Sequence, residues 1–220
     1  MKNLIALNLK VYSESLGQGG LNLALIAAEV AHETGARIVI CPQTVDLAAV
    51  CKIKGIDVFA QHVDANKQGA FTGSTTVEAI KSAGAKGSLI NHAEKKQPHN
   101  LVKEAIDKMR ALQLESLACS ADIEESKILA GFRPNFVAVE PPELIGSGIS
   151  VSSAKPEVVT GSVKAVKQVA DVAVLCGAGI STGADVKKAI ELGTCGVLLA
   201  SAYVKAKDPK ALLRDMARNL

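Results

Sequence analysis

The residues best placed to do chemistry follow a short apolar segment near position 140. Phe136–Val139 is aromatic and aliphatic, Glu140 comes directly after it, and a loop bounded by Pro141 and Gly148 follows. A carboxylate at the carboxyl end of a buried strand is a common position for a catalytic residue in an α/β barrel. A loop with prolines at one end and glycines at the other is typical of a hinged lid. Such a glutamate can also cap a helix or pair with a lysine, so the residues at the other strand ends decide its interpretation.

A lysine and a histidine stand at comparable positions in the first half of the chain. Lys10 follows one short apolar segment and His92 follows another. Most lysines and lone histidines are ordinary surface residues, but Glu94 is placed to orient the ammonium group of Lys10. A helix that starts at His92 would disfavour the imidazolium form, and the neutral ring could then polarise a carbonyl group. His62, beside Asp64, is a weaker candidate of the same kind.

Glycine-rich sequence in the last third of the chain predicts a phosphate site. Gly177, Gly179 and Gly183 leave backbone N–H groups unhindered ahead of a predicted helix, and Ala200-Ser201 ends the next apolar segment. The loops after the seventh and eighth strands of an α/β barrel commonly bind phosphate. Glycines of this kind also occur in ordinary tight turns, so the prediction depends on the barrel.

Together these groups favour one kind of reaction. The carboxylate of Glu140 can remove a proton from a carbon next to a carbonyl group, and His92 and Lys10 can stabilise the resulting enediolate oxygen. The glycine-rich sequence would hold a phosphorylated tail. No second acidic residue stands at the predicted strand ends as a metal ligand, and the sequence has no His/Cys cluster. We therefore expect a reaction that uses no metal and no cofactor.

Short apolar segments alternate with helical patterns along the whole chain, and these elements must position the polar residues. The apolar segments lack polar alternation, as expected for parallel strands buried on both faces. Eight strand–helix units predict a single (β/α)8 barrel over residues 1–220, with an open doubly wound sheet as the alternative. The expected strands are Leu4–Asn8, Arg37–Cys41, Asp57–Gln61, Gly87–Asn91, Glu115–Cys119, Phe136–Glu140, Ala173–Cys176 and Gly196–Ala200. The expected helices are Leu21–Thr34, Leu101–Leu112, Val158–Val169, Ala184–Leu192 and Lys210–Leu220.

Composition limits the partners and the compartment. The 25 basic and 22 acidic residues give a net charge of only +3, without basic blocks or tryptophan, which argues against nucleic acid as a partner. Five cysteines without C-x-x-C spacing are typical of reduced thiols in a cytoplasmic protein. The sequence has no signal peptide and no apolar run of membrane-spanning length, so we expect no membrane association.

These motifs resemble those of the triosephosphate isomerase family over the whole length of the chain. Asn8-Leu9-Lys10 resembles the family's Asn-x-Lys, Asn91-His92-Ala93-Glu94 its Asn-His-Ser-Glu, and Ala138-Val139-Glu140-Pro141 its Tyr-Glu-Pro. Ile145-Gly146-Ser147-Gly148 is similar to its hinged lid. Gly69–Gly73 is similar to the tip of a loop that packs into a neighbouring subunit.

The resemblance implies the interconversion of D-glyceraldehyde 3-phosphate and dihydroxyacetone phosphate, a step of glycolysis and gluconeogenesis. It implies Glu140 as the base, His92 as the electrophile and Lys10 as the stabilising cation. A neutral histidine beside a carboxylate base is already described for this family. The substrate-binding residues that it implies are Asn8, Leu9, Lys10, Ile145, Gly146, Gly179, Ala200 and Ser201.

The chain also departs from the usual family pattern. It is shorter than the ~250 residues typical of such barrels, which predicts trimmed outer helices. Its lid begins Pro141-Pro142-Glu143 instead of Pro-Val-Trp, and Ala200-Ser201 replaces Gly-Gly. These features resemble the short archaeal form, which implies a homotetramer more than a dimer. Ala93 replaces a serine, from which we expect a kinetic adjustment.

Two alternatives remain at this point. Another phosphosugar barrel enzyme would share the fold and the phosphate loops, but would not be expected to combine Lys10, His92 and Glu140. A non-catalytic sensor of phosphorylated ligands would be expected to have lost the base or the electrophile, and both are present.

Overall fold

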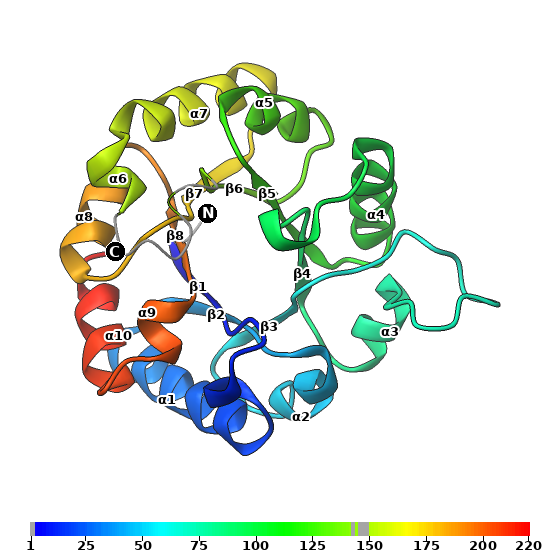
Figure 1. Cartoon of the computed structure of the whole chain (residues 1–220), viewed down its shortest axis with the longest axis horizontal. Coiled ribbons are helices and arrows are strands. Elements are labelled where there is room, and N and C mark those ends of the chain that lie inside the picture. Colours follow the sequence, from blue (N-terminus) through cyan, green and yellow to red (C-terminus); the bar gives the residue numbers. More distant parts are fainter. Residues whose placement is uncertain (1–2, 142–143, 145–149) are drawn as a thin grey trace.

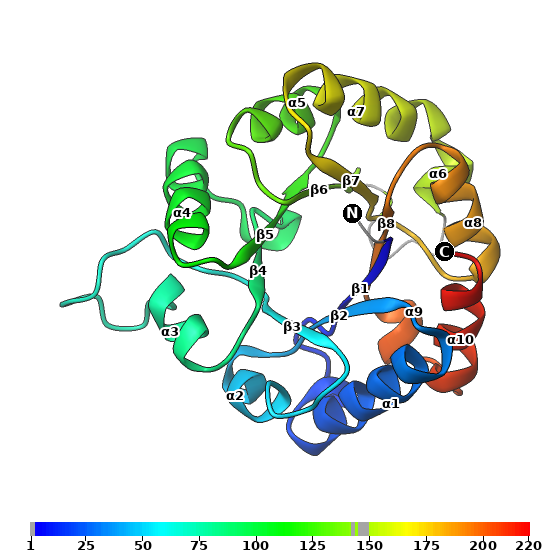
Figure 2. The same cartoon turned by 180° about the vertical axis from the view of Figure 1, so that it is seen from behind.

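Eight parallel strands form a closed barrel in the computed structural model, which describes residues 3–141, 144 and 150–220. The strands pair in sequence order, and β8 returns to pair with β1. Figure 1 looks along the barrel, with the helices in a ring outside the strands, and Figure 2 shows the opposite side. The (β/α)8 prediction is confirmed. The strands are β1 (Leu4–Asn8), β2 (Arg37–Cys41), β3 (Asp57–Ala60), β4 (Gly87–Ile90), β5 (Glu115–Ser120), β6 (Phe136–Val139), β7 (Ala173–Cys176) and β8 (Gly196–Leu199).

The strands are apolar on both faces because each face packs against a separate hydrophobic cluster. In β1, Leu4 and Ala6 belong to a small cluster built from strand residues, whereas Ile5 and Leu7 join the larger cluster that includes the helices. Successive side chains of a strand point to opposite faces, so one cluster fills the barrel and the other lies between barrel and helices. This arrangement explains the absence of polar alternation in the sequence.

The predicted helices are present, and some of the helices that the sequence did not predict are short. Among the described residues, α2 (Leu47–Val50) has four residues and α3 (Val77–Ser82) has six, which agrees with trimmed outer helices. No helix in this part of the chain is long and apolar enough to cross a membrane. The others are α1 (Gln18–Thr34), α4 (His99–Ala111), α5 (Ile123–Gly131), α6 (Val151–Ala154), α7 (Pro156–Val169), α8 (Gly183–Glu191), α9 (Ser201–Val204) and α10 (Pro209–Arg218), with 3-10 turns η1 (Ser13–Ser15), η2 (Thr44–Asp46) and η3 (Ala93–Lys95).

The connection between β3 and α3 is a long excursion that extends away from the barrel (Figures 1 and 2). Its base is closed by Asp64, whose N–H donates to the carbonyl oxygen of Thr75 at 2.8 Å and whose carboxylate accepts from the Thr75 N–H at 2.7 Å. Phe71, near the tip, is half exposed. The excursion is therefore an organised arm that presents an aromatic ring to its surroundings.

Candidate active site

A cavity of about 380 Å³ lies at the carboxyl ends of the strands. Most of the predicted site residues whose positions are described line it. Leu9 does not, because its side chain is fully buried in the core and its N–H donates to the carbonyl oxygen of Cys41. Ile145 and Gly146 lie outside the described residues. The predicted residues that line the cavity are Asn8, Lys10, His92, Glu140, Gly179, Ala200 and Ser201.

Glu140 is a buried carboxylate directly beyond the end of β6. Its N–H donates to the carbonyl oxygen of Ser120 at 2.8 Å, which holds it against β5. The residue is only 4% exposed, and its Oε2 has no hydrogen-bond partner among the residues that the structure describes. Burial raises the pKa of Glu140 above the ordinary value of 4.5, while the His92 ring and the Cys119 thiol act in the opposite direction. An ionised carboxylate held in this way is a stronger base than an exposed one.

The side chain of Glu140 occupies space that only a glycine at position 177 leaves open. A Cβ atom on Gly177 would lie 2.3 Å from Cγ of Glu140 and 3.2 Å from the carbonyl oxygen of Val139. Gly177 also donates its N–H to that same carbonyl, at 2.9 Å, so its backbone cannot move away without breaking the sheet hydrogen bond. The end of β7 is thus shaped around the carboxylate.

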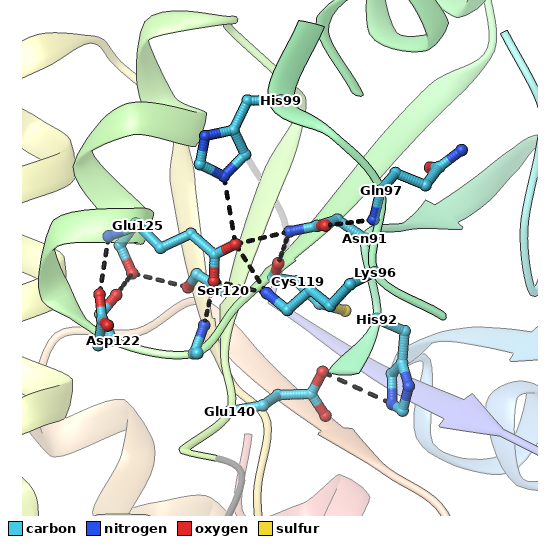
Figure 3. Close-up of polar contacts among 12 residues, drawn as sticks. Asn91, His92, Lys96, Gln97, His99, Cys119, Ser120, Asp122, Glu125 and Glu140 are labelled. Carbon is cyan, nitrogen blue, oxygen red and sulfur yellow. Dashed lines mark hydrogen bonds and ion pairs between the residues drawn. The ribbon is translucent and has the colours of Figure 1, made fainter. Parts of the chain in front are cut away.

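His92 faces Glu140 across the cavity (Figure 3), with 3.7 Å between its Nε2 and Oε2 of the carboxylate. The sequence predicts a helix start here, and the structure shows a short 3-10 turn, η3, with His92 at its N-cap. The backbone N–H of Glu94 donates to Nδ1 of His92 at 3.2 Å. Because Nδ1 accepts a hydrogen bond, a neutral ring must carry its proton on Nε2, the nitrogen that faces the cavity.

Lys10 reaches the cavity through a turn set by its neighbours. Its backbone is in the left-handed region, with φ of 47°, and its N–H donates to Oδ1 of Asn8 at 3.0 Å. Gln61 donates to the carbonyl oxygens of Lys10 and Cys41, at 2.9 and 3.0 Å, and ties the first three strand ends together. The ammonium group donates to Glu94 at 2.7 Å, as the sequence predicts.

A polar network behind His92 fixes the end of β4 (Figure 3). Asn91, with φ of 61°, donates to the carbonyl oxygen of Cys119 at 3.0 Å and to Glu125 at 2.9 Å. Lys96 donates to both oxygens of the Glu125 carboxylate, at 2.7 and 2.6 Å. Burial alone would raise the pKa of Glu125, but hydrogen bonds to its carboxylate lower the pKa by more, so that it falls below its ordinary value. The hydrogen bond from Lys96 has the largest lowering effect. The network joins the strand ends that carry His92 and Cys119.

The glycine-rich loop after β7 is held by two aspartates of the protein itself. One oxygen of Asp185 accepts from the N–H and hydroxyl groups of both Ser181 and Thr182, at 2.9 to 3.2 Å. Asp215 on α10 accepts from the N–H of Gly183 at 2.9 Å. These carboxylates occupy the N-terminus of α8, where an anion would otherwise bind. The part of the loop that lines the cavity runs from residue 177 to residue 181 and includes Gly179, whose φ is 71°.

Sequence reasoning missed one cation of the cavity and examined three histidines that do not line it. Lys205 lines the cavity one turn after Ser201. The spacing of four residues would have placed both on one helix face, had the four-residue α9 been recognised. His62 instead pairs with Asp64 at 3.0 Å, and neither His32 nor His99, both exposed as predicted, reaches the cavity. Among the described residues no group of three His, Cys, Asp or Glu side chains is arranged to hold a metal ion.

Known proteins are similar in sequence to this chain over nearly its whole length. The family model described as triosephosphate isomerase matches residues 3–217. A triosephosphate isomerase of Methanocaldococcus jannaschii is 49% identical over 98% of this chain and 99% of its own length. That of Methanothermus fervidus is 50% identical over 97% of this chain and 96% of its own. A match of this length, on a barrel whose rim brings together Lys10, His92 and Glu140, shows that the chain belongs to the triosephosphate isomerase family.

Proposed function

We propose that Glu140, His92 and Lys10 carry out the isomerisation for which the family is named, the interconversion of D-glyceraldehyde 3-phosphate and dihydroxyacetone phosphate. This member of the family is an isomerase of triose phosphates, and the proposal concerns the residues that perform each step. Residues 1–220 act together as one catalytic domain.

Glu140 is the proposed base. Its carboxylate takes the proton from the carbon next to the carbonyl group, and the electrons of that C–H bond move into the enediolate. The protonated Glu140 then delivers the proton to the former carbonyl carbon, while the hydroxyl proton on the other oxygen passes to the former carbonyl oxygen, so that a new carbonyl group forms and no atom is gained or lost. The observation that carries the assignment is the buried Glu140 carboxylate in the cavity lining, whose Oε2 has no hydrogen-bond partner among the described residues and lies 3.7 Å from Nε2 of His92. Burial of a carboxylate favours its protonated form, so that it takes up a proton more readily.

His92 and Lys10 are proposed to stabilise the oxygen on which charge develops. The Glu94 N–H on Nδ1 favours the tautomer that presents Nε2–H to the cavity, and that N–H can donate to the carbonyl or enediolate oxygen. Such a neutral histidine beside a carboxylate base is already described for this family. Glu94 holds the Lys10 ammonium at 2.7 Å, so the cation is in place before substrate binds.

The phosphate group is proposed to bind the backbone at Gly179, Ala200 and Ser201, with Asn8 lining the other side of the cavity. Ile145 and Gly146, which lie outside the described residues, are proposed to bind the substrate as well. The side chain of Leu9 is not part of this proposal, because it lies in the core. We propose no metal and no cofactor for the reaction.

We further propose that the enzyme works as a homo-oligomer, a tetramer rather than a dimer. The arm between β3 and α3 presents a half-exposed Phe71, and Val11 and Val45 are each 80% exposed. Large apolar side chains on an arm and on neighbouring strand-end loops suit contact with a second copy. The reduced, buried thiols of Cys41, Cys119 and Cys176 suit a cytoplasmic enzyme of glycolysis and gluconeogenesis.

The test is isomerisation of D-glyceraldehyde 3-phosphate by the purified protein in excess EDTA, with Glu140→Gln as the comparison. We expect rapid turnover that the substitution lowers by about 1,000-fold, because a positioned general base contributes 10²–10⁴-fold. Binding of glycerol 3-phosphate, which cannot isomerise, should be retained. No turnover by folded wild-type protein that still binds this analogue would favour the sensor, and unchanged turnover in Glu140→Gln would remove Glu140 as the base.

A further inference from the structure

Lys205 is a second cation of the cavity, and it differs from Lys10 in its partners. It lies just after α9, and its side chain lines the same cavity as Ser201 and Gly179. Its Nζ lies 4.5 Å from the centre of the Tyr12 ring, in the turn that follows Lys10. Among the described residues the carboxylate of Glu14 interacts with it electrostatically without ion-pair contact, whereas the ammonium group of Lys10 is held by Glu94 at 2.7 Å.

The charges around the cavity indicate that a cation is needed to offset the negative charge of a bound phosphate group. Lys10 and Glu94 cancel one another at 2.7 Å, and the ionised Glu140 adds one negative charge. A phosphate ester carries a charge of about −1.5 to −2 at pH 7. Without Lys205 a dianion would enter a cavity whose other ionisable side chains are already negative in sum, and backbone N–H groups supply only partial charges.

We propose that Lys205 is a substrate-binding residue that pairs with the phosphate group of the triose phosphate. The inference rests on the proposed function and adds to it the residue that selects a phosphorylated over a neutral triose. Tyr12 holds the ammonium at the cavity by a cation–π contact, which positions the charge without neutralising it. Lys205 binds the end of the substrate that does not react, so its effect is on substrate binding and on the rate of encounter.

The experiment compares Lys205→Met with Lys207→Met, which removes the same charge from an exposed lysine outside the cavity lining. Both variants are assayed with D-glyceraldehyde 3-phosphate and with D-glyceraldehyde, which has no phosphate. Lys205→Met should lower kcat/KM for the phosphorylated substrate by about 10-fold, mainly through KM, since a charge-assisted hydrogen bond contributes about 1.5 kcal/mol or more. Its kcat/KM for D-glyceraldehyde, and both values for Lys207→Met, should not change.

Two further variants separate binding from a structural effect. Lys205→Arg keeps a cation and should recover most of the lost kcat/KM. Tyr12→Leu removes only the ring beneath the ammonium and should raise KM by about 2- to 5-fold, the size of an exposed cation–π contact. Rising salt should reduce the difference between wild type and Lys205→Met, because the contact is exposed to solvent.

The outcomes distinguish this inference from the proposed function. If wild type does not isomerise D-glyceraldehyde 3-phosphate, the proposed function fails and the inference fails with it. If wild type is active and Lys205→Met keeps its KM for that substrate, the inference alone is wrong. Equal losses on both substrates would also overturn it, because they would place the effect on the chemistry or on the fold.

Discussion

The two ends of the barrel each hold charged side chains away from full solvent exposure, and they differ in the partners that these charges have. At the amino ends of the strands, the guanidinium group of Arg37 donates to Asp57 at 2.9 Å and to Glu115, and it lies 5.7 Å from the centre of the Phe136 ring. At the carboxyl ends, Glu140 is more deeply buried, and its Oε2 has no hydrogen-bond partner among the described residues, with Nε2 of His92 3.7 Å away.

In our proposal, the difference separates a charge that stabilises the fold, on Arg37, from one that reacts with substrate, on Glu140. Burial alone would lower the pKa of Arg37, but its hydrogen bonds to Glu115 and Asp57 raise it. The charged form of Arg37 is therefore more stable in the folded protein than in water. At the other end, burial raises the pKa of Glu140 and the neighbouring groups do not compensate. In our proposal, the Glu140 carboxylate takes up a proton from the substrate. The comparison of Arg37 with Glu140 leads us to three predictions.

The largest effect is expected from Lys10→Ala at the carboxyl end. Removing one preorganised charge from a site of transition-state stabilisation typically costs 10²–10³ in rate, so kcat/KM for D-glyceraldehyde 3-phosphate should fall by about that factor. The free energy of unfolding should change little, because the exposed pair with Glu94 contributes little to it. Steady-state kinetics and urea unfolding measure the two quantities. A variant that loses stability and keeps its activity would remove the distinction between the two ends of the barrel.

Arg37→Met at the amino end should have the reverse profile. It leaves Asp57 and Glu115 without their cation, and we expect the free energy of unfolding to fall by about 2–3 kcal/mol, less than for a fully buried pair. Activity of the folded fraction should equal that of wild type. Adding Asp57→Asn and Glu115→Gln should recover part of the lost stability, which would not occur if Arg37 acted mainly through its contact with Phe136.

The smallest effect is a gain of stability in Glu140→Gln. The folded protein holds the Glu140 proton more tightly than the unfolded chain does, because the folded pKa is the higher one. Wild type therefore loses stability as the pH rises from the unfolded pKa through the folded pKa, and the neutral amide does not. The difference in free energy of unfolding between Glu140→Gln and wild type should increase between about pH 4 and pH 9, by about 1.4 kcal/mol per unit of difference between the two pKa values. A gain that is independent of pH would contradict this origin.

Much of the fold follows from features that the sequence displays locally. Continuous apolar runs locate all eight strands because those strands are buried on both faces, and their carboxyl ends locate Lys10, His92 and Glu140. The ends of some strands were predicted one residue too long, for example at Asn91. Its left-handed backbone takes it out of the ladder so that its side chain can reach Glu125.

Other features depend on contacts that leave no local pattern. Helix α5 was not predicted, and its polar Ser126 is fully buried while its Ile128 is 44% exposed, the opposite of an amphipathic helix. Asp215 meets Gly183 from 32 positions away, so no spacing connects them. Lys205 follows a helix of four residues, which is too short to show a period.

The close approach of Gly177 to Glu140 sets an order on the substitutions that this lineage can accept. Glu140 can be replaced by a smaller residue while Gly177 stays, because no atoms then collide between the two positions. The glycine cannot be replaced first, since a side chain at 177 would meet Cγ of any longer residue at 140 at 2.3 Å. A protein designer who moves Glu140 to another barrel must therefore move the end of β7 together with it.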